Sequence, residues 1–422
     1  MRRATRTIET PVVPSVGILA LVPDSWSDLW QPRHQVLTRL ARYFHVVWVN
    51  PARGWREVLT RRMAPPASSV AGHHEAAFTV YEPEFWLPKV YRPTGVARLT
   101  ERLRLERACR LLAQRGCRRT VLYLWRPEFA FALGTVPADL SCYHIDDEYS
   151  FSTVEIPTPE AEARLIGAVD QVFIHSRALL EKKGAINRHT AWVPNGVDYR
   201  AYARPVNEPG DLTPIARPRI GYTGHIKRQL DWALLRGLAD RHPEWSFVFV
   251  GAWNAHPEML ATIQDLSRRR NVHFLGRKSV QELAVYPQHF DVCIMPYQAD
   301  DYTKYIYPLK LHEYLASGRP TVGTRIRSLE DFTDVVSLAA TPDGWSAAIA
   351  MALKPEANSV ERRAARRAVA HQHDWTLLVR RIAETIAGRL GCEFVEPVDP
   401  AGPDEGDDGR VLQGAPAPGR CA

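Results

Sequence analysis

Residues 305–324, with the sequence YIYPLKLHEYLASGRPTVGT, decide the fold that we expect for this chain. Pro308 suits the first turn of a helix, because its missing N–H would have no partner there. Two leucines four positions apart predict a buried stripe along this helix. Gly318 is expected to end the helix in a left-handed conformation, and Pro320 prevents its continuation. A short strand follows at 321–322, so a helix leads into a strand, as in parallel α/β sheets.

Two charged side chains make this helix a candidate binding element. Lys310 lies in the first turn, where the helix dipole disfavours a cation, and Glu313 follows one turn later. A cation is favourable here if an anion binds beside it, and a carboxylate can accept hydrogen bonds from sugar hydroxyls. The alternative is an exposed Lys–Glu pair that contributes about a few tenths of a kcal/mol.

The whole stretch resembles the nucleotide-sugar motif of GT-B glycosyltransferases, and it is most similar to the GT4-like (group 1) pattern P-L-K-L-x-E-Y-L-A-x-G-x-P. The resemblance runs from about residue 16 to about residue 387. It implies an α/β fold with two Rossmann-like, doubly wound domains that face a cleft, and a C-terminal helix that crosses back. It also implies that Glu313 holds the ribose hydroxyls of the donor. Many relatives carry a second glutamate eight positions earlier, where this chain has Tyr305.

Composition narrows the classes of function. A chain of 422 residues with 45% hydrophobic residues is expected to form two domains with real cores. The net charge of +7 suits acidic small molecules, an anionic membrane or nucleic acid. Scattered arginines and the absence of a recognition helix, zinc pattern or RNP sequence argue against nucleic acid. Six cysteines without paired spacing predict a reduced, cytoplasmic chain, and no apolar run approaches the roughly 20 residues of a membrane span.

Short apolar runs separated by helical patterns predict two successive sheets. No G-x-G-x-x-G fingerprint follows the first strand, which argues against a dehydrogenase. Residues 51–95 are expected to be irregular, and 100–114 to form a basic amphipathic helix. The expected strands are 16–22, 45–49, 120–124, 141–145, 172–174 and 191–193 in the first half, and 220–222, 247–250, 273–275, 292–295 and 321–322 in the second.

Composition shifts along the chain predict its domain boundaries. The turn P-N-G-V-D at 194–198 resembles the one that closes the first domain in the family, and the tail is rich in Pro, Gly and Asp. The expected segments are a loose leader at 1–14, an N-terminal acceptor domain at 15–204, a linker at 205–218, a nucleotide-sugar-binding domain at 219–372, a closing helix at 373–392 and a disordered tail at 393–422.

The loop after the first strand of the second half is the expected phosphate site. Gly224 allows close approach of the backbone, while Lys227 and Arg228 can neutralise a diphosphate. The resemblance implies that this loop contacts donor phosphates. The alternative is an ordinary turn with solvated charges, which the nearby Lys310–Glu313 helix makes less favourable.

The resemblance implies that two further segments contact the donor. Gly276 and Arg277 end a strand and correspond to a segment that lines the base pocket, although a surface loop is as consistent with the Arg277 side chain. Four residues before the central helix lie on a loop that approaches the donor sugar in relatives; they are Asp300, Tyr302, Lys304 and Tyr305.

Residues 143–148, YHIDDE, end a strand of the first half, where ligands of open α/β sheets bind. His144 is a candidate for proton transfer from an acceptor hydroxyl, and Asp146 is the competing base. A satisfied structural histidine is the alternative for His144. Three adjacent acids without other ligands are a poor divalent-metal site, so we expect no metal.

Aromatic and basic residues on the first loop are expected on the acceptor side. Trp26 and Trp30 can stack on sugars and Arg33 can meet a phosphate, with buried packing as the alternative. The basic helix 100–114, with Phe85 and Trp86 nearby in sequence, is also compatible with contact to an anionic membrane, although a solvated basic face explains it as well.

We therefore expect a metal-independent, hexosyltransferase-like enzyme that moves a sugar from a nucleotide-diphosphate sugar to an acceptor hydroxyl, with retention, in polysaccharide, glycolipid or other glycoconjugate biosynthesis. Lys227, Arg228 and Lys310 would stabilise the departing diphosphate, and no cofactor is expected. The acceptor would be a sugar, a lipid-linked sugar or a small molecule, and the protein cytoplasmic or peripheral on the inner membrane face. The rival functions are a nucleotide-sugar epimerase and a catalytically silent nucleotide-sugar-binding protein, for which Tyr305 is the best support.

Overall fold

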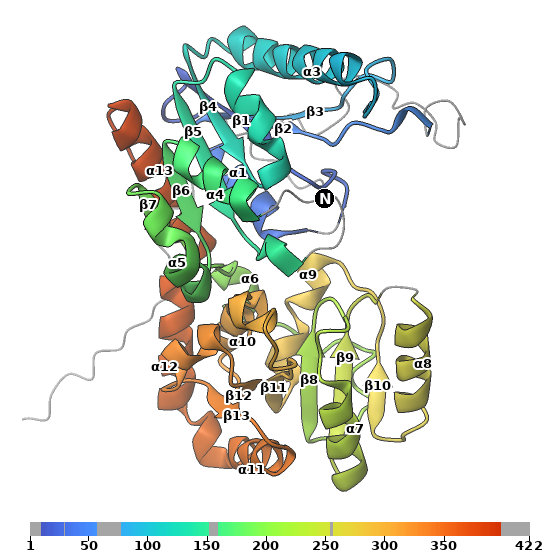
Figure 1. The fold of residues 1–422 in the computed structure, drawn as a ribbon. Helices are drawn as coiled ribbons and strands as arrows, with labels where there is room; N and C mark the ends of the chain where they lie inside the picture. Colours follow the sequence, from blue (N-terminus) through green and yellow to red (C-terminus); the bar gives the residue numbers. More distant parts are fainter. Residues whose placement is uncertain (1–9, 29, 57–76, 152–158, 254–255, 398–422) are drawn as a thin grey trace, which may run out of the picture.

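The computed structural model describes residues 10–28, 30–56, 77–151, 159–253 and 256–397. Two sheets with helices packed around them form an upper and a lower domain in Figure 1. The first sheet has the order β3-β2-β1-β4-β5-β6-β7 and the second β10-β9-β8-β11-β12-β13. Every strand pair within them is parallel. The expected α/β architecture with two doubly wound sheets is therefore confirmed.

Apolar strands form the first sheet, and most of their side chains are buried because helices cover both faces. Its strand order reverses between β1 and β4, which makes the carboxyl ends of these strands a switch point where ligands bind. The strands are β1 (Val16–Leu21), β2 (His45–Val49), β3 (Phe78–Tyr81), β4 (Arg119–Leu124), β5 (Leu140–Ile145), β6 (Gln171–Ile174) and β7 (Thr190–Trp192). The main helices are α1 (Pro32–Leu40), α3 (Thr94–Gln114), α4 (Pro159–Ala168) and α5 (Arg177–Lys183).

The second sheet reverses its order between β8 and β11, so the loops after these two strands leave toward opposite sides of one crevice. The strands are β8 (Arg219–Thr223), β9 (Ser246–Val250), β10 (Val272–Phe274), β11 (Val292–Met295), β12 (Thr321–Thr324) and β13 (Ser337–Ala339). The helices are α6 (Tyr199–Ala203), α7 (Trp232–Arg241), α8 (Pro257–Leu266), α9 (Val280–Leu283), α10 (Leu309–Ser317), α11 (Pro342–Ala352) and α12 (Val360–Gln372).

The central helix α10 follows its sequence signals closely. Pro308 is the N-cap residue, one position before the helix, and Gly318 ends it with φ 78°. Leu311 and Leu315 are fully buried, as their spacing predicts. The helix lies in the lower domain, directly below the first domain (Figure 1).

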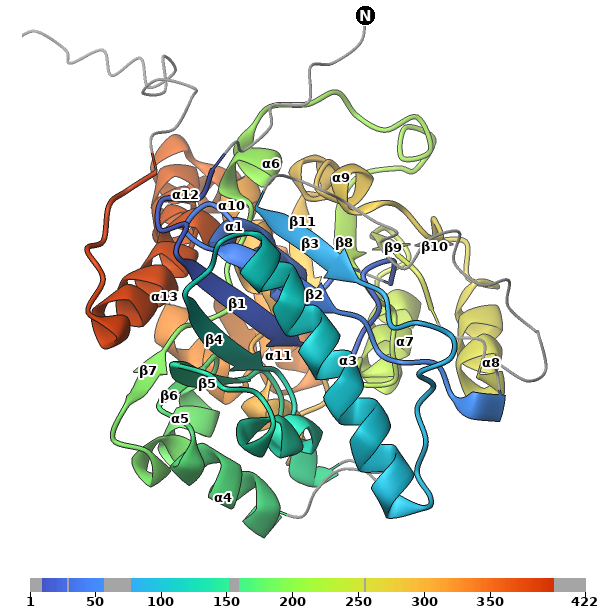
Figure 2. The same cartoon turned by 90° about the horizontal axis from the view of Figure 1, so that it is seen from above.

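The last helix, α13 (Trp375–Leu390), packs on the first domain although it follows the second in sequence (Figures 1 and 2). Leu378, Ile382 and Ile386 are buried in the core around β1, β2 and α1. The crossing point is tight, because a Cβ atom added at Gly196 would lie 2.6 Å from the His373 carbonyl oxygen.

Several elements differ from the expectation. Residues 51–95 contain strand β3, the basic helix begins at Thr94 rather than 100, and β13 and α12 were not anticipated. The segment expected as a linker, 205–218, buries Leu212 and Ile215 in the core of the second domain. Residues 1–9 of the expected leader and 398–422 of the expected tail lie outside the described residues. Within the described residues, no helix combines the length and apolar character that crossing a membrane requires.

Candidate active site

Three glycines form a floor of bare backbone at the carboxyl edge of the second sheet. Gly224, Gly251 and Gly276 follow β8, β9 and β10 and have φ angles of 107°, 151° and 72°. The Gly251 amide donates to the Gly276 carbonyl at 2.9 Å. A Cβ atom at Gly251 would lie 2.0 Å from the Gly224 carbonyl oxygen, so only glycine fits there. Gly224 and Gly276 were sequence candidates; Gly251 was missed, although a glycine directly after an apolar strand is a usable signal.

The ammonium group of Lys310 lies against this floor. A Cβ atom at Gly224 would lie 2.6 Å from Lys310 Nζ, and this atom is 5.2 Å from the centre of the Tyr222 ring. The pKa of Lys310 is lowered to about 8, mainly by burial; the charge of Glu313 opposes this shift and the charge of Lys227 adds to it. An anion bound beside this amine would raise its pKa again, because it favours the charged form.

The two basic residues of the β8 loop have different surroundings. Lys227 is half-buried and Arg228 is exposed. Burial lowers the pKa of Lys227, and the carboxylate of Asp147 in the first domain opposes this shift. The charge of Lys227 thus acts on Asp147 of the first domain and on Lys310 of its own domain.

Glu313 has a partner that the sequence did not suggest. The Tyr202 hydroxyl, on α6, forms a hydrogen bond with the Glu313 carboxylate. Burial raises the pKa of Glu313, whereas Lys310 and then Tyr202 lower it. The segment after 198 was expected to lead into a linker, but Asp198 caps α6 by accepting from the Ala201 amide at 3.3 Å, and this cap was a local signal for a helix.

Arg277, the other candidate beside the glycine floor, has an exposed side chain. Its neighbour Lys278 forms an ion pair with Asp211, with 2.7 Å between Nζ and Oδ2. Of the two residues expected to line the nucleobase pocket, only Gly276 therefore belongs to the glycine floor.

The four candidates before α10 separate into two groups. Asp300 accepts from the amides of Tyr302 and Thr303, at 3.0 and 2.7 Å, and so shapes its own turn. Lys304 pairs with Asp301 at 3.0 Å on the surface. These local contacts, typical of an Asx turn and of a surface pair, give no direct sign of a sugar ligand.

Tyr302 and Tyr305 instead contact the first domain. The Tyr302 hydroxyl donates to Asp147 Oδ2 at 3.2 Å. The Tyr305 ring has Lys182 Nζ at 4.9 Å from its centre and packs against the first domain's core. Tyr305, which replaces the second glutamate of many relatives, therefore has a packing role between the domains.

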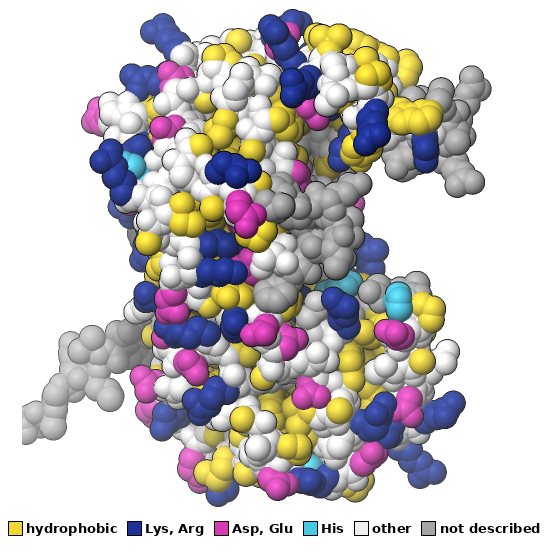
Figure 3. Space-filling view, viewed as in Figure 1, with side chains coloured by type: hydrophobic (Ala, Val, Ile, Leu, Met, Phe, Trp, Pro, Cys, Tyr) yellow, Lys and Arg dark blue, Asp and Glu magenta, His cyan; other side chains and the backbone are white. Residues whose placement is uncertain are grey.

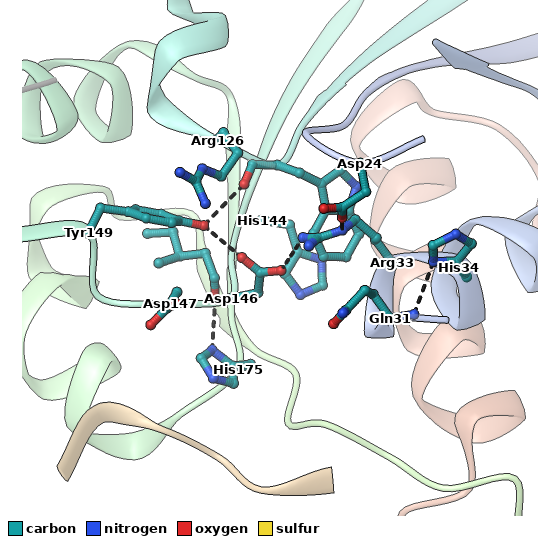
Figure 4. Close-up of polar contacts among 12 residues, drawn as sticks. Asp24, Gln31, Arg33, His34, Arg126, His144, Asp146, Asp147, Tyr149 and His175 are labelled. Atoms are coloured by element: carbon teal, nitrogen blue, oxygen red, sulfur yellow. Dashed lines mark hydrogen bonds and ion pairs between the residues drawn. The ribbon is translucent and has the colours of Figure 1, made fainter. Parts of the chain in front are cut away.

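In the first domain, Asp146 is the centre of a polar network (Figure 4). Its Oδ1 accepts from the Tyr149 hydroxyl at 2.6 Å, and its Oδ2 pairs with Arg33 Nη1 at 2.8 Å. Arg33 also pairs with Asp24. The expectation that Arg33 meets an acceptor phosphate is not matched by these contacts, because two carboxylates already surround its guanidinium.

His144 is enclosed by aromatic side chains. It stacks on Trp125 with 4.2 Å between ring centres, and its Nδ1 shares a hydrogen bond of 2.9 Å with the Tyr123 hydroxyl. Burial lowers the pKa of His144 to about 3, with the charge of Asp146 opposing. The imidazole is therefore neutral near pH 7, and its surroundings favour the structural alternative over proton transfer.

The two candidate tryptophans belong to one aromatic cluster behind the first loop. Trp26 makes an edge contact with Trp48, with 5.3 Å between ring centres. Trp30 is 38% exposed and stacks on His34 at 4.8 Å. Of the two, Trp30 has the more accessible ring.

The described residues contain no group of three or more His, Cys, Asp or Glu side chains arranged to hold a metal ion.

Residues 217–354 match the family model of the group 1 glycosyl transferases. The chain is 34% identical over 176 residues to the putative teichuronic acid biosynthesis glycosyltransferase TuaH of Bacillus subtilis (strain 168). The aligned part is 40% of this chain and 43% of that protein, so it spans less than half the length of this curated relative.

Solved structures share the architecture at low sequence identity. Anabaena Alr3699/HepE in complex with UDP and glucose has a TM-score of 0.61 and 16% identity, over 89% of this chain and 100% of that one. An E. coli trehalose-6-phosphate structure bound with UDP-2-fluoro glucose has a TM-score of 0.64 and 12% identity, over 90% of this chain and 100% of that one. At these identities the likeness establishes the fold, which is the expected GT-B arrangement.

Proposed function

We propose that the protein is a glycosyltransferase, because residues 217–354 match the family model of the group 1 glycosyl transferases and the two sheets form a GT-B fold. It would move a sugar from a nucleotide-diphosphate sugar to an acceptor hydroxyl. The observation that carries the proposal is the pair of half-buried lysines within the matched domain: Lys310 beside the floor at Gly224, and Lys227 on the loop after β8.

The donor site follows from the chemistry of these groups. The diphosphate would lie between the two lysines and over the glycine floor, where backbone approach is unhindered. Glu313, fixed by Tyr202, would accept hydrogen bonds from the ribose hydroxyls. The base would then lie toward Gly276 and Arg277. UDP is the first nucleotide to test, because HepE and the E. coli structure are described with UDP or a UDP-sugar bound.

Catalysis would be electrostatic. As the bond from the sugar to the diphosphate breaks, negative charge grows on the leaving group, and ammonium groups already in place stabilise that charge without reorganisation. The family resemblance favours retention of anomeric configuration. Proton NMR of the first product formed from an α-linked donor would show an α-linkage, whereas a β-linkage would exclude retention.

Metal independence is part of the proposal, because the two lysines supply the positive charge that a divalent ion supplies elsewhere. Turnover measured in excess EDTA should equal turnover without chelator. Loss of activity in EDTA with recovery in magnesium or manganese would refute this part alone.

The acceptor would enter from the first domain, past Trp30 and the acidic residues after β5. A growing polysaccharide or other glycoconjugate is the proposed acceptor class, since TuaH is named for teichuronic acid biosynthesis. A catalytically silent nucleotide-sugar-binding protein is the second candidate function, because Tyr305 stands where many relatives carry a second glutamate. An acceptor-dependent release of UDP supports transfer; binding without release supports the silent protein, and conversion of donor without acceptor supports an epimerase.

The first experiment is calorimetric titration of UDP into the wild-type protein and into Glu313→Gln. We expect binding to weaken by roughly tenfold or more in the variant, since hydrogen bonds to a charged group contribute about 1.5–3 kcal/mol. Tyr202→Phe, which keeps the carboxylate, is the matched control and should lose less. Equal affinities for wild type and Glu313→Gln would refute the donor site.

We also propose that the first domain contacts an anionic membrane surface, with the protein peripheral on the cytoplasmic face. Exposed large apolar side chains are concentrated in one part of the sequence and lie among cations: Trp55, Phe85, Trp86, Tyr91, Val96 and Leu99. Arg107 lies 4.8 Å from the centre of the Trp86 ring and Lys89 lies 5.1 Å from that of Tyr91. Apolar and basic side chains also adjoin at the upper right of Figure 3. Such mixtures suit anionic interfaces.

Co-sedimentation with vesicles tests this contact. Binding to phosphatidylcholine vesicles containing phosphatidylglycerol should exceed binding to phosphatidylcholine alone, and Phe85→Ser/Trp86→Ser should reduce it severalfold. Met351→Ser/Val360→Ser, which alters equally exposed side chains of the second domain, is the control. Equal sedimentation with both kinds of vesicle would refute the contact.

A further inference from the structure

Two adjacent carboxylates follow β5, and they have different partners (Figure 4). Asp146 is the carboxylate that the sequence offers as a base in competition with His144. Both of its oxygens are occupied, Oδ1 by the Tyr149 hydroxyl and Oδ2 by Arg33, and its side chain is only 12% exposed. Asp146 is thus one partner of a buried ion pair, and breaking such a pair is costly.

Asp147 is directed away from this network and toward the second domain. Its Oδ2 accepts from the Tyr302 hydroxyl at 3.2 Å, and its Oδ1 accepts from the Glu148 amide at 2.8 Å. Both donors are neutral, so protonation of Asp147 costs no ion pair of the kind that holds Asp146.

Asp147 lies beside residues of the proposed donor site. Lys227, at the proposed diphosphate, is the cation whose charge acts on Asp147, and Asp147 is the carboxylate that acts on Lys227. Tyr302 lies on the loop after β11 and Lys227 on the loop after β8, the two loops of the switch point. Asp147 therefore faces the crevice where the leaving group and the acceptor must meet.

We propose that Asp147 orients the acceptor hydroxyl and takes its proton during transfer; this rests on the proposed glycosyltransferase function. The acceptor O–H bond breaks as its oxygen forms a bond to the anomeric carbon. The bond from that carbon to the diphosphate breaks, and its electron pair stays on the diphosphate. The proton passes to the Asp147 carboxylate and from there to water.

The electrostatic surroundings of Asp147 agree with this role. Burial raises its pKa, and the charge of Asp146 on the same strand end raises it further. The adjacent Glu148 amide lowers it, as do the Tyr302 hydroxyl and the Lys227 ammonium of the second domain, and the balance is a raised pKa. A carboxylate with a raised pKa holds a proton more readily than an ordinary aspartate does.

The test compares variants by kcat, by donor KM and by calorimetric UDP affinity. Asp147→Asn should lower kcat by roughly a hundredfold or more, the usual size of a general-base effect, while its UDP affinity is kept or increased. Asp147→Glu should recover part of the activity. A kcat for Asp147→Asn within about threefold of wild type would overturn the proposal.

The pH profile separates proton transfer from a structural role. In the wild type, kcat/KM should fall with acid as Asp147 becomes protonated, and Asp147→Asn should lack this acid limb. Tyr302→Phe removes a hydrogen bond that lowers the pKa of Asp147, so its limb should move to higher pH. Asp146→Asn removes a charge that raises that pKa, so the limb should move to lower pH. If this variant does not fold, the direction of the shift in Tyr302→Phe still tests whether the limb belongs to Asp147.

Persistence of the acid limb in Asp147→Asn would refute the role of Asp147 and leave the proposed function intact. A wild-type protein that binds UDP but transfers no sugar would instead refute the proposed function, and the inference with it.

Discussion

At the scale of single residues, Lys227 and Lys310 belong to different loops of one domain, and burial lowers the pKa of each. If they hold one diphosphate, removing either ammonium group should lower kcat/KM for the donor by roughly tenfold or more, at about 1.4 kcal/mol per decade. The combined loss should be smaller than the sum, because the two groups share a ligand. A double-mutant cycle with Lys227→Ala and Lys310→Ala measures this.

Arg228→Ala is the matched control for that cycle, because Arg228 is the exposed neighbour of Lys227. It should change kcat/KM by no more than about threefold. Strictly additive losses for the two lysines would mean that they do not act on a common group.

The lowered pKa of Lys310 predicts how donor binding depends on pH. Below its pKa of about 8 the amine is charged and attracts the diphosphate; above it the charge is lost. Affinity for UDP should therefore be highest near neutral pH and decline as the pH rises through about 8. Isothermal titration from about pH 7 to about pH 9 checks this, with Lys310→Met as the control that should show a flatter dependence.

At the scale of elements, the ends of β8, β9 and β10 depend on glycines for their close approach. Gly251→Ala should lower Tm by several degrees and weaken UDP binding, because the new Cβ atom would overlap the Gly224 carbonyl and φ is positive. Thermal unfolding monitored by circular dichroism measures the first effect.

Gly237→Ala is a suitable comparison for this prediction. Gly237 lies within α7, and a Cβ atom there meets nothing within 4 Å. The substitution should leave Tm unchanged or raise it, since alanine favours a helix over glycine by roughly 0.5–1 kcal/mol. An equal Tm for both variants would contradict the account of the glycine floor.

At the scale of the whole molecule, the turn at 194–198, where the chain crosses from the first domain to the second, connects the site to the first domain. Asn195 Nδ2 donates to the Tyr307 carbonyl at 2.8 Å, and Asn195 is 7% exposed. Asn195→Ala should cost about 1–3 kcal/mol, because a buried carbonyl loses its donor just before α10. It should also weaken UDP binding, since Lys310 is placed by the start of that helix.

Asn187→Ala provides the comparison, because Asn187 is equally buried but bonds only within the first domain, to the carbonyls of Ile166 and Val169. Both variants should lower Tm, and only Asn195→Ala should lower UDP affinity. A wild-type affinity in Asn195→Ala would show that the crossover does not position α10.

Much of the fold was determined by the sequence because its signals are local. Strands β2 and β11 and the end of α10 at Gly318 follow from apolar runs, a glycine and prolines within a few residues of one another. The donor motif at Lys310 and Glu313 is likewise contiguous. Strand β3 is rich in apolar residues, but it has only four residues and lies within the proline-rich segment 51–95, so local pattern did not reveal it; it depends on pairing with β2.

The tertiary structure decided which of several chemically similar neighbours faces the cleft. Composition cannot distinguish Lys227 from Arg228, or Asp146 from Asp147, because each pair has the same charge and adjacent positions. The distinction depends on partners distant in sequence: Arg33 occupies Asp146, and Tyr302 reaches Asp147 from the other domain. Burial and long-range contacts also made His144 neutral and gave Glu313 its hydrogen bond to Tyr202, since both effects depend on how separate elements pack.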